Sequence, residues 1–500
     1  MLRLPTATLL AAALPLAQLG AQQPQPTQRS ELAALTAFLA IPNVATDKPN
    51  IARNAQWLKS EFERRGFHMT LVATPGSPVL IGEYMPPAGK PTRTLTFYFH
   101  YDGQPVTASE WKDSGPFAPI FRDKPFENGG RVVTLPASGP IDPEWRLYAR
   151  SAADDKSPIV SFLSAMDEAK AAGTPVTSIV RVLMEGDEEA GSPSLPAVVK
   201  AHAAEIRSDL VLLVDGPRHP SGRPTFAFGA RGIMSAELTV YGARLDLHSG
   251  NYGNWAPNPA IELSRLIAQM KDSTGRVTIP GFYDDVVPLT AEEKTAIAEV
   301  PDVDTTLMRR FGFARSDFAG QRLEALHNLP TLNVSGLGSG TVAGQGRTVI
   351  PADAVARMDL RFVKNVTPDK QYARLESFVR SHGYHLIAGD APTEEERARY
   401  PLLARLRRMG GYPAGRTPLT NPTAQQAVAA VAAAMHTTPA RLPTLGGSVP
   451  FYLFSDDLAA PTVLMPVVNF DDNQHGPNEN VRLGNFFDAI VMMRAIITMK

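Results

Sequence analysis

The feature of this sequence that most constrains its fold is a series of short β-rich runs separated by segments with helical periodicity. The runs at 95–100, 178–185 and 210–214 are nearly continuous in apolar residues, as is typical of strands buried on both faces of a parallel sheet. The segments at 51–65 and 159–171 have helical periodicity. This alternation predicts an α/β fold with a mainly parallel central sheet, and such a sheet places its chemistry at the carboxyl ends of its strands.

The pattern changes after residue 232. Residues 235–241 and 355–363 alternate between apolar and polar positions, which indicates strands that face solvent on one side. Residues 370–381 have the pattern of an amphipathic helix, and 275–330 resemble an irregular, partly helical insertion. We therefore expect a second, α+β domain in this region.

The chain has 500 residues, which exceeds the usual size of one compact core and predicts two or three domains. A helical pattern at 423–435 and a β-rich run at 462–467 indicate that the chain returns to the first domain. The expected division is a catalytic domain made of 22–232 and 416–500, with a lid of 233–415 inserted into it.

Composition excludes several classes of function. Lys and Arg number 49 and Asp and Glu number 50, so the net charge is −1 and a nucleic-acid partner is not expected. The sequence has no cysteine, which excludes disulfides and thiolate metal ligands. Any metal ion must therefore be held by His, Asp and Glu side chains.

The N-terminus has the pattern of an export signal. Arg3 supplies a positive charge, 9–19 is a short apolar run, and Gly20 and Ala21 are small residues suited to cleavage. The alternative is an apolar N-terminus on a cytosolic protein. We expect a signal peptide at 1–21 and a secreted or periplasmic protein. No membrane span is expected, because one needs about 20 apolar residues.

Acidic or imidazole side chains follow several of the expected strands. His100 ends the first β-rich run, and Asp102 could accept the second ring N–H of its imidazole, as in many metal-ligating histidines. The alternative is a hydrogen-bonded loop histidine. Asp154 and Asp155 open an expected helix, where two carboxylates could also serve as an N-cap.

Three further segments complete the series. Four carboxylates lie between residues 185 and 189, directly after a β-rich run. Gathering them is costly unless a cation or solvent neutralises their charge, and a solvated acidic loop is the alternative. Asp215 closes the run at 210–214, and His475 follows the run at 462–467.

Together these segments resemble the M20 metallopeptidase family over roughly 30–500. The H-x-D, D-D-K and E-G-D-E-E-A-G-S segments and the late histidine occur in the family's order. The resemblance implies a zinc-peptidase-like catalytic domain with a ferredoxin-like lid that mediates dimerisation. It also implies two Zn²⁺ ions per subunit, with Mn²⁺ or Co²⁺ as alternatives, held by His100, Asp154, Glu189, Asp215 and His475.

The resemblance further assigns roles within this set. Asp154 would bridge the two ions, and each ion would also bind one histidine and one further carboxylate. Asp102 would lie behind His100, and Glu188 would be the general base. The peptide bond between Asp154 and Asp155 would be cis.

A second group of residues resembles the family's substrate-contacting elements. His248, in the segment 246–250, would stabilise the oxyanion, often across a dimer interface, so a homodimer through the lid is expected. A loop histidine in a turn is the alternative. Arg361 would bind the substrate's carboxylate or carbonyl, unless it is a solvent-facing strand residue. Gly447 and Ser448 belong to a loop whose N–H groups could hold a carboxylate.

These resemblances imply an enzyme that hydrolyses the peptide bond of dipeptides or short peptides, through a water that bridges two metals. Aspartate at position 215, where carboxypeptidases and deacetylases more often carry glutamate, resembles the dipeptidase and aminopeptidase branch, and the E-G-D-E-E-A-G-S segment resembles carnosinase-like members. The alternative is an N-acyl amino acid amidohydrolase, deacylase-like or carboxypeptidase-like. A non-catalytic binding domain would predict a missing ligand or base, and each expected position is present.

Overall fold

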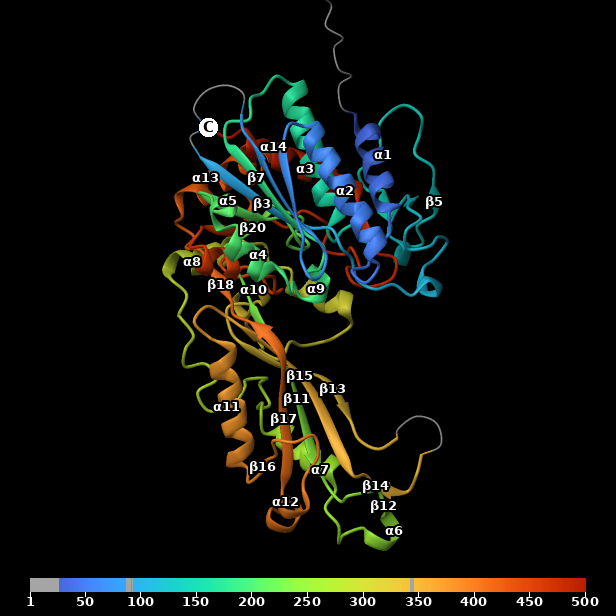
Figure 1. The fold of residues 1–500 in the computed structure, drawn as a ribbon, viewed down its shortest axis with the longest axis vertical. Helices are drawn as coiled ribbons and strands as arrows, with labels where there is room; N and C mark the ends of the chain where they lie inside the picture. Colours follow the sequence, from blue (N-terminus) through green and yellow to red (C-terminus); the bar gives the residue numbers. More distant parts are fainter. Residues whose placement is uncertain (1–26, 87–90, 92, 342–345) are drawn as a thin grey trace, which may run out of the picture.

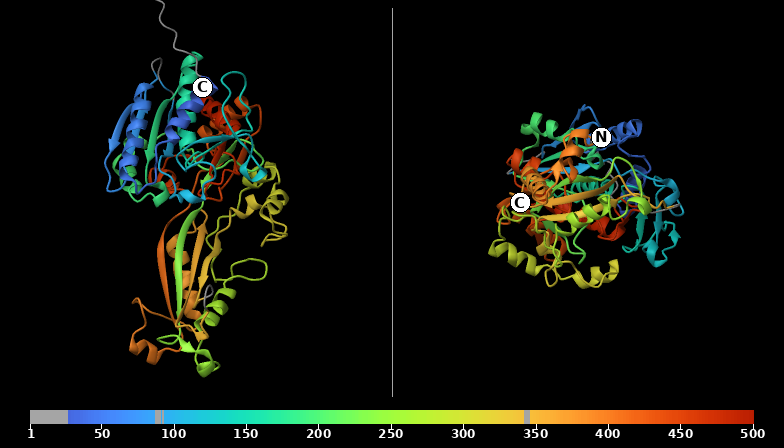
Figure 2. Two further views of the ribbon diagram at one scale, coloured as in Figure 1. Left: turned by 90° about the vertical axis from the view of Figure 1, so that its right-hand side faces the viewer. Right: turned by 90° about the horizontal axis from the view of Figure 1, so that it is seen from below.

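The computed structural model describes residues 27–86, 91, 93–341 and 346–500. It has an upper part, in which helices surround a large sheet, and a narrower lower part built on a second sheet (Figure 1). The side view shows the lower part extending away from the upper one, so the molecule is elongated (Figure 2). The expected signal peptide, 1–21, lies outside the described residues.

An eight-stranded sheet forms the centre of the upper part, in the order β1-β2-β7-β3-β8-β20-β9-β19. The neighbouring strands β7, β3, β8 and β20 run parallel, which confirms the mainly parallel centre, whereas β1 and β2 are antiparallel additions at one edge. The strands are β1 (His68–Val72), β2 (Val79–Tyr84), β3 (Thr94–His100), β7 (Ile179–Glu185), β8 (Leu210–Leu213), β9 (Thr225–Ala227), β19 (Ala440–Leu442) and β20 (Thr462–Leu464).

Both faces of this sheet are buried. Along β3, Phe97 and Phe99 pack into one apolar cluster and Tyr98 into another. Successive side chains of a strand point to opposite faces, so the nearly continuous apolar run is explained by two cores. The helices of the upper part are α1 (Gln28–Leu39), α2 (Lys48–Arg64), α3 (Lys156–Ala171), α4 (Leu195–Ala201), α5 (Ala203–Ile206), α13 (Pro422–Met435) and α14 (Leu483–Ile497).

A smaller sheet joins segments that are distant in the sequence. Its order is β21-β6-β4-β5, and β21, which follows the expected ligand His475, pairs antiparallel with β6, which precedes Asp154. The strands are β4 (Ile120–Arg122), β5 (Val132–Val133), β6 (Arg146–Tyr148) and β21 (Asn480–Arg482). This pairing places the two ligand-bearing loops side by side.

The lower part is a five-stranded sheet in the order β13-β15-β11-β17-β16, with its own apolar core. Positions along β15 alternate between buried and more exposed, as expected for a strand that faces solvent on one side. Its elements are β11 (Gly232–Tyr241), β12 (Leu247–His248), α6 (Ser249–Tyr252), α7 (Pro259–Ala268), β13 (Thr331–Gly338), β14 (Val349–Ile350), β15 (Asp353–Phe362), α11 (Pro368–Ser381), β16 (His385–Leu386), α12 (Glu394–Arg399) and β17 (Leu403–Tyr412).

Two features connect the parts. The chain passes between them through β10 (Gly229–Ala230) and β18 (Gly415–Arg416), which pair with each other. The segment with α8 (Ala291–Glu299), α9 (Asp304–Phe311) and α10 (Leu323–Leu326) returns to the upper part, where α8 packs against β19. Figure 1 shows this segment at the junction, although it lies within the expected lid range.

No helix among the described residues combines the length and the apolar character needed to cross a membrane.

Candidate metal centre and substrate pocket

The expected metal ligands lie at one edge of the large sheet, where its parallel strands end. His100 is the last residue of β3, and Asp215 follows β8. Glu188 and Glu189 lie in the 3₁₀ turn Glu188–Ala190, shortly after β7. His475 lies in the loop between β20 and β21. These positions agree with the rule that parallel sheets gather their chemistry at the carboxyl ends of the strands.

Asp154 occupies the centre of this group, in the turn before α3. Its Oδ1 lies 2.7 Å from His100 Nε2, and its Oδ2 lies 3.1 Å from His475 Nε2. The two imidazoles therefore face the two oxygens of one carboxylate. The Asp154–Asp155 peptide bond is cis, as the family resemblance implies.

Two groups of ligand atoms form around Asp154. One consists of His100, Asp154 and Asp215, and the other of Asp154, Glu189 and His475, with the ligand atoms of each group within 4.8 Å of one another. Each group offers one imidazole nitrogen and two carboxylates, and Asp154 belongs to both. These donors suit zinc, manganese or cobalt, so the geometry fits two ions that share one carboxylate.

The electrostatics of the site also fit bound cations. Burial raises the pKa of Glu189 to about 7 and that of Asp215 to about 6, and the negative charge of Asp154 adds to both shifts. Burial raises the pKa of Glu188 well above its ordinary value. Burial also opposes ionisation of Asp154, but the neighbouring imidazoles hold its pKa below the ordinary value. Divalent cations would neutralise this cluster, so the residues present fit a dinuclear metal site.

Asp102 connects one imidazole to the acidic turn. Its Oδ1 lies 3.4 Å from His100 Nδ1. The same buried carboxylate accepts hydrogen bonds from the backbone N–H groups of Glu188 and Glu189, both at 3.1 Å. The side chain thus fixes the position of the 3₁₀ turn relative to the end of β3.

Two glutamines contact the candidate ligands directly and were not singled out from the sequence. Gln474 Nε2 donates to Asp154 Oδ2 at 2.5 Å, and Gln104 Nε2 donates to Glu189 Oε2 at 2.6 Å. Both lie within the loops that carry the His475 and His100 segments, which was the signal available in the sequence.

Glu479 is a further residue that the sequence analysis missed. Its fully buried carboxylate accepts hydrogen bonds from the backbone N–H groups of Ser151, Ala153 and Asp154 at 3.0, 2.9 and 2.9 Å. It also pairs with Arg150 at 2.6 Å. Glu479 therefore ties the turn that carries the shared carboxylate to the loop between β20 and β21. Its place in the polar segment after the late histidine is the only local hint of this task.

Replacing Glu479 by glutamine is expected to weaken metal binding about 10–100-fold, as is typical when a partner behind the ligands is lost. The amide keeps the size of the side chain but loses the charge opposite Arg150 and presents N–H groups to backbone donors. Titration of the metal-stripped protein with Zn²⁺, followed by calorimetry and by activity, measures the change. We expect kcat to recover at high Zn²⁺ concentration.

The matched control is Glu293→Gln, which alters another buried glutamate, one that caps α8 and pairs with Arg416. Zn²⁺ affinity should be unchanged in this variant. An unaltered Zn²⁺ affinity in Glu479→Gln would show that Glu479 does not position the ligands.

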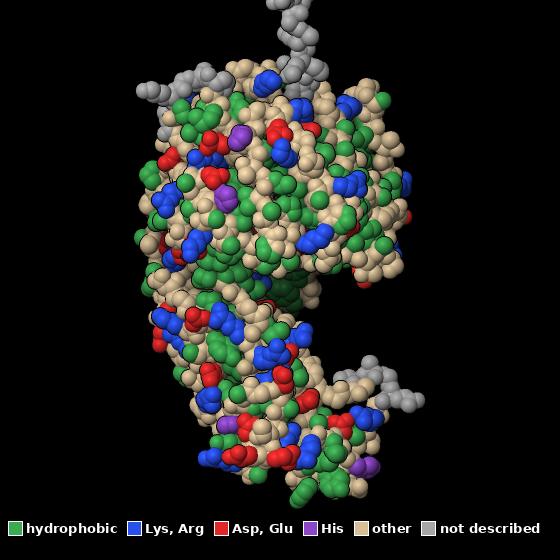
Figure 3. All heavy atoms as spheres, viewed as in Figure 1, with side chains coloured by type: hydrophobic (Ala, Val, Ile, Leu, Met, Phe, Trp, Pro, Cys, Tyr) green, Lys and Arg blue, Asp and Glu red, His purple; other side chains and the backbone are tan. Residues whose placement is uncertain are grey.

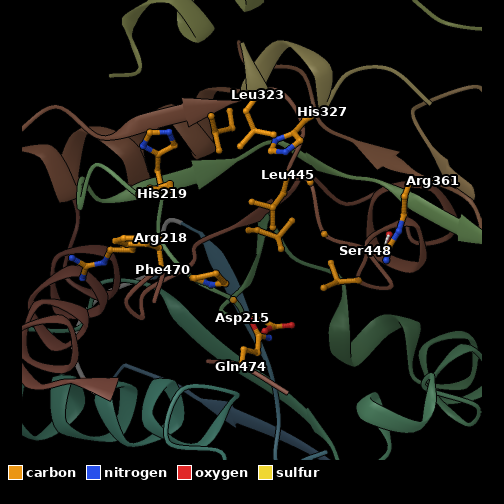
Figure 4. Close-up of a pocket in the computed structure, with 18 of the residues that line it drawn as sticks. Asp215, Arg218, His219, Leu323, His327, Arg361, Leu445, Ser448, Phe470 and Gln474 are labelled. Atoms are coloured by element: carbon orange, nitrogen blue, oxygen red, sulfur yellow. Dashed lines mark hydrogen bonds between the residues drawn. The ribbon is translucent and has the colours of Figure 1, made fainter. Parts of the chain in front are cut away.

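A cavity of about 660 Å³ opens beside the candidate ligands, and Glu188 and Asp215 line one end of it. Arg361, from β15 of the lower part, and Gly447 and Ser448, from the upper part, line another side. Arg361 Nη1 donates to Ser448 Oγ at 2.6 Å (Figure 4). The two parts therefore meet at this pocket, and the space-filling view shows a hollow on one side of their junction (Figure 3).

His248 is the one expected site residue that lies apart from the others. It ends β12 at the far end of the lower part (Figure 1), is exposed, and accepts a hydrogen bond from Gly250 N–H at 3.1 Å through Nδ1. It does not line the pocket. Within one chain, the structure does not bring His248 to the candidate metal ligands.

Comparison with known proteins agrees with this arrangement. A model of peptidase family M20/M25/M40 matches residues 96–499. The chain is 26% identical to the Cys-Gly metallodipeptidase of Saccharomyces cerevisiae, over 93% of this chain and 94% of that protein. It is 25% identical to the β-Ala-His dipeptidase of Rattus norvegicus, over 84% of this chain and 79% of that protein. The M20 family metallo-carboxypeptidase Sso-CP2 of Sulfolobus solfataricus has a similar structure, with a TM-score of 0.74 and 28% identity over 94% of this chain and 98% of that chain.

One prediction from the sequence is contradicted by these comparisons. The expected secreted or periplasmic location is wrong, because the yeast Cys-Gly metallodipeptidases that match this chain are cytosolic enzymes. A short apolar run beside one arginine is a weak pattern that an apolar N-terminus can also produce.

Proposed function

Because the chain belongs to peptidase family M20/M25/M40, we propose that it hydrolyses the peptide bond of dipeptides or similarly short peptides at a dinuclear metal site. The chain is a metal-dependent hydrolase of peptide bonds. Its Cys-Gly and β-Ala-His dipeptidase relatives support dipeptides as the substrate class. These relatives do not favour the alternative function, that of an N-acyl amino acid amidohydrolase, over that of a dipeptidase.

The observation that carries the proposal is the shared carboxylate. Asp154 presents one oxygen to His100 and the other to His475, and a separate carboxylate, that of Glu188, lines the same pocket without belonging to either ligand group. Because this carboxylate is not used as a ligand, it can accept a proton and donate it again.

In this proposal, two Zn²⁺ ions, or Mn²⁺ or Co²⁺ in their place, are held by His100, Asp154, Glu189, Asp215 and His475. Bound there, they would supply Lewis acidity that polarises the scissile carbonyl and lowers the pKa of the attacking water. Glu188 takes the proton of that water and returns it to the leaving amine. Asp102 holds the backbone of Glu188 and so fixes the position of the base.

The opposite side of the pocket is proposed to bind the substrate's terminal carboxylate. The Arg361 guanidinium is planar and presents paired N–H donors, which match the two oxygens of a carboxylate. The Ser448 hydroxyl lies next to it, and Gly447 lines the same wall. These contacts would orient the peptide bond toward Glu188.

We further propose that the chain forms a homodimer through the lower part, with His248 serving the partner's pocket. Large apolar side chains near His248 are open to solvent: Trp255 is 79% exposed and Leu245 is 61% exposed. A second copy would bury them. Sedimentation equilibrium of the full chain at micromolar concentration should give a dimer, and a monomer would contradict this part of the proposal.

The domain division is proposed on the same basis. Residues 22–232 and 416–500 would form the catalytic domain, and 233–415 the lid. The separate apolar core of the five-stranded sheet and the paired crossing strands β10 and β18 support these boundaries, although α8, within the lid range, packs against β19 of the catalytic domain.

A substrate panel tests the proposed function. We expect the Zn²⁺-loaded enzyme to hydrolyse Ala-Ala and Cys-Gly with a kcat/KM at least about tenfold above that for N-acetyl-alanine, which lacks a free α-amino group, because the relatives that the chain matches are dipeptidases. Liberated amino acids are measured by chromatography. Chelation should abolish the reaction, and added Zn²⁺ should restore it. Faster hydrolysis of N-acetyl-alanine would favour the amidohydrolase instead.

A further inference from the structure

The pocket beside the metal ligands has an extensive apolar wall on the side away from Arg361. Figure 4 shows Leu445 and Phe470 between Asp215 at one end and His219, Leu323 and His327 at the other. The apolar side chains of this wall come from separate segments of the chain: Leu307, Phe311, Leu323, Leu442, Leu445 and Phe470. This wall is continuous with the end of the pocket where hydrolysis is proposed.

Part of the wall is supplied by the helix α9. Leu307 and Phe311 are four residues apart, so they lie on the same face of this helix, and Gly312 ends it with a left-handed backbone conformation (φ 75°). Both side chains line the pocket; Leu307 is buried, whereas Phe311 is 64% exposed. A large aromatic ring left open to water beside a cavity gains stability when an apolar group covers it.

The segment with α9 and α10 is anchored to the upper part. The Arg310 guanidinium lies over the Phe470 ring, 5.2 Å from its centroid, and 3.8 Å from Asp471. Glu324, which is buried on α10, pairs with His219 of the upper part at 3.0 Å. These contacts hold the apolar wall in place against the pocket.

The ionisable side chains His219, Glu324 and Arg218 along this wall have partners within the protein. His219 pairs with Glu324, and Arg218 pairs with Asp488 at 2.8 Å. Burial lowers the pKa of His327 to about 4, so its imidazole is neutral near pH 7. A charged substrate side chain would lose its water here without gaining a partner, whereas an apolar one would lose nothing.

We propose that this wall binds a large apolar side chain of the substrate, so that leucine- and phenylalanine-containing dipeptides are preferred over those with small or charged residues. The inference rests on the proposed dipeptidase function and specifies its substrates. The relatives that the chain matches are named for Cys-Gly and β-Ala-His, whose first residues are small. Phe311, Leu307 and Leu323 would set the preference.

The first test measures kcat/KM for Xaa-Gly and Gly-Xaa dipeptides in which Xaa is Ala, Leu, Phe or Lys. At one of the two positions, Leu or Phe should exceed Ala by about tenfold or more, since each added methylene in an apolar pocket favours the larger substrate. Lys should fall below Ala. Ratios close to one at both positions would overturn the inference, even though hydrolysis of Ala-Gly would still support the proposed dipeptidase.

The second test locates the preference. Phe311→Ala and Leu307→Ala should each lower the Leu-to-Ala ratio at least about fivefold. Phe311 is largely exposed, so its removal should leave the fold intact. Leu71→Ala, which removes a 45% exposed leucine from β1 on a strand outside the pocket, is the control and should keep the ratio. A ratio that is unchanged in both pocket variants would overturn the inference.

A binding measurement separates this inference from the proposed chemistry. Calorimetric titration of the Zn²⁺-loaded Glu188→Gln variant with Leu-Leu and Ala-Ala compares affinities where turnover is expected to be lost. Tighter binding of Leu-Leu by about tenfold or more supports the apolar wall, even if no dipeptide is hydrolysed by the unmodified enzyme. Equal affinities would overturn it.

Discussion

Replacing Asp154 by asparagine is expected to remove most of the bound metal and to lower kcat/KM for Ala-Ala by about 10³-fold or more. Asp154 is the only residue common to both candidate ligand groups among the described residues, so its loss affects both sites. Asparagine keeps one side-chain oxygen, which can face one imidazole, but places an amide nitrogen opposite the other imidazole. Elemental analysis of the purified variant, together with kcat/KM, measures both effects.

The control for this change is Asp167→Asn, which alters another aspartate of the α3 region, one that pairs with Arg65 away from the site. It should retain two metal ions per chain and its activity. If Asp154→Asn also retained two ions, Asp154 would not be the bridging ligand, and the assignment of the dinuclear site would be wrong.

Replacing Glu188 by glutamine is expected to lower kcat by about 10²–10⁴-fold while the metal content stays at two ions per chain, because the amide cannot accept the proton of the attacking water. Burial raises the pKa of Glu188, so a neutral amide is tolerated at this site. The backbone N–H of residue 188 donates to Asp102 at 3.1 Å, so the replaced side chain should keep the position of Glu188. Stopped assays with Ala-Ala and elemental analysis measure the two quantities separately.

Glu205→Gln is the control, because Glu205 is 53% exposed and pairs with His202 on the surface. Its kcat should equal that of the unmodified enzyme. An unchanged kcat in Glu188→Gln would assign the base to another group. A loss of metal together with activity would instead make Glu188 a ligand.

Much of the upper part could be predicted from the sequence because each buried strand carries its own signal. The run that leads to His100 is apolar at nearly every position, as is typical of a strand that is covered on both faces. The imidazole of His100 follows this run directly. The same pattern before Asp215 leads to a side chain at the same edge of the sheet. Periodicity and position along the chain therefore indicated where acidic and imidazole side chains would gather, and the family resemblance was needed to assign them as ligands.

Other features leave no such local signal. The strand β17 contains Arg407, Arg408, Gly410 and Gly411, which resemble an exposed turn, and its strand conformation depends on pairing with β11. Glu479 acts through backbone N–H groups of a turn 325 residues away, so no pattern around it describes its partner. The apolar wall likewise combines α9 with loops of the upper part and exists only once they have packed together.

The order of the strands has a consequence for how the enzyme becomes active during its synthesis. β20 lies between β8 and β9 in the sheet, and His475 is 321 residues downstream of Asp154. A ribosome needs roughly tens of seconds to add that many residues. Once Asp215 has been added, the growing chain has one imidazole and the carboxylates but still lacks His475. Peptide hydrolysis therefore begins only after the final segment has inserted into a sheet that the earlier strands leave open.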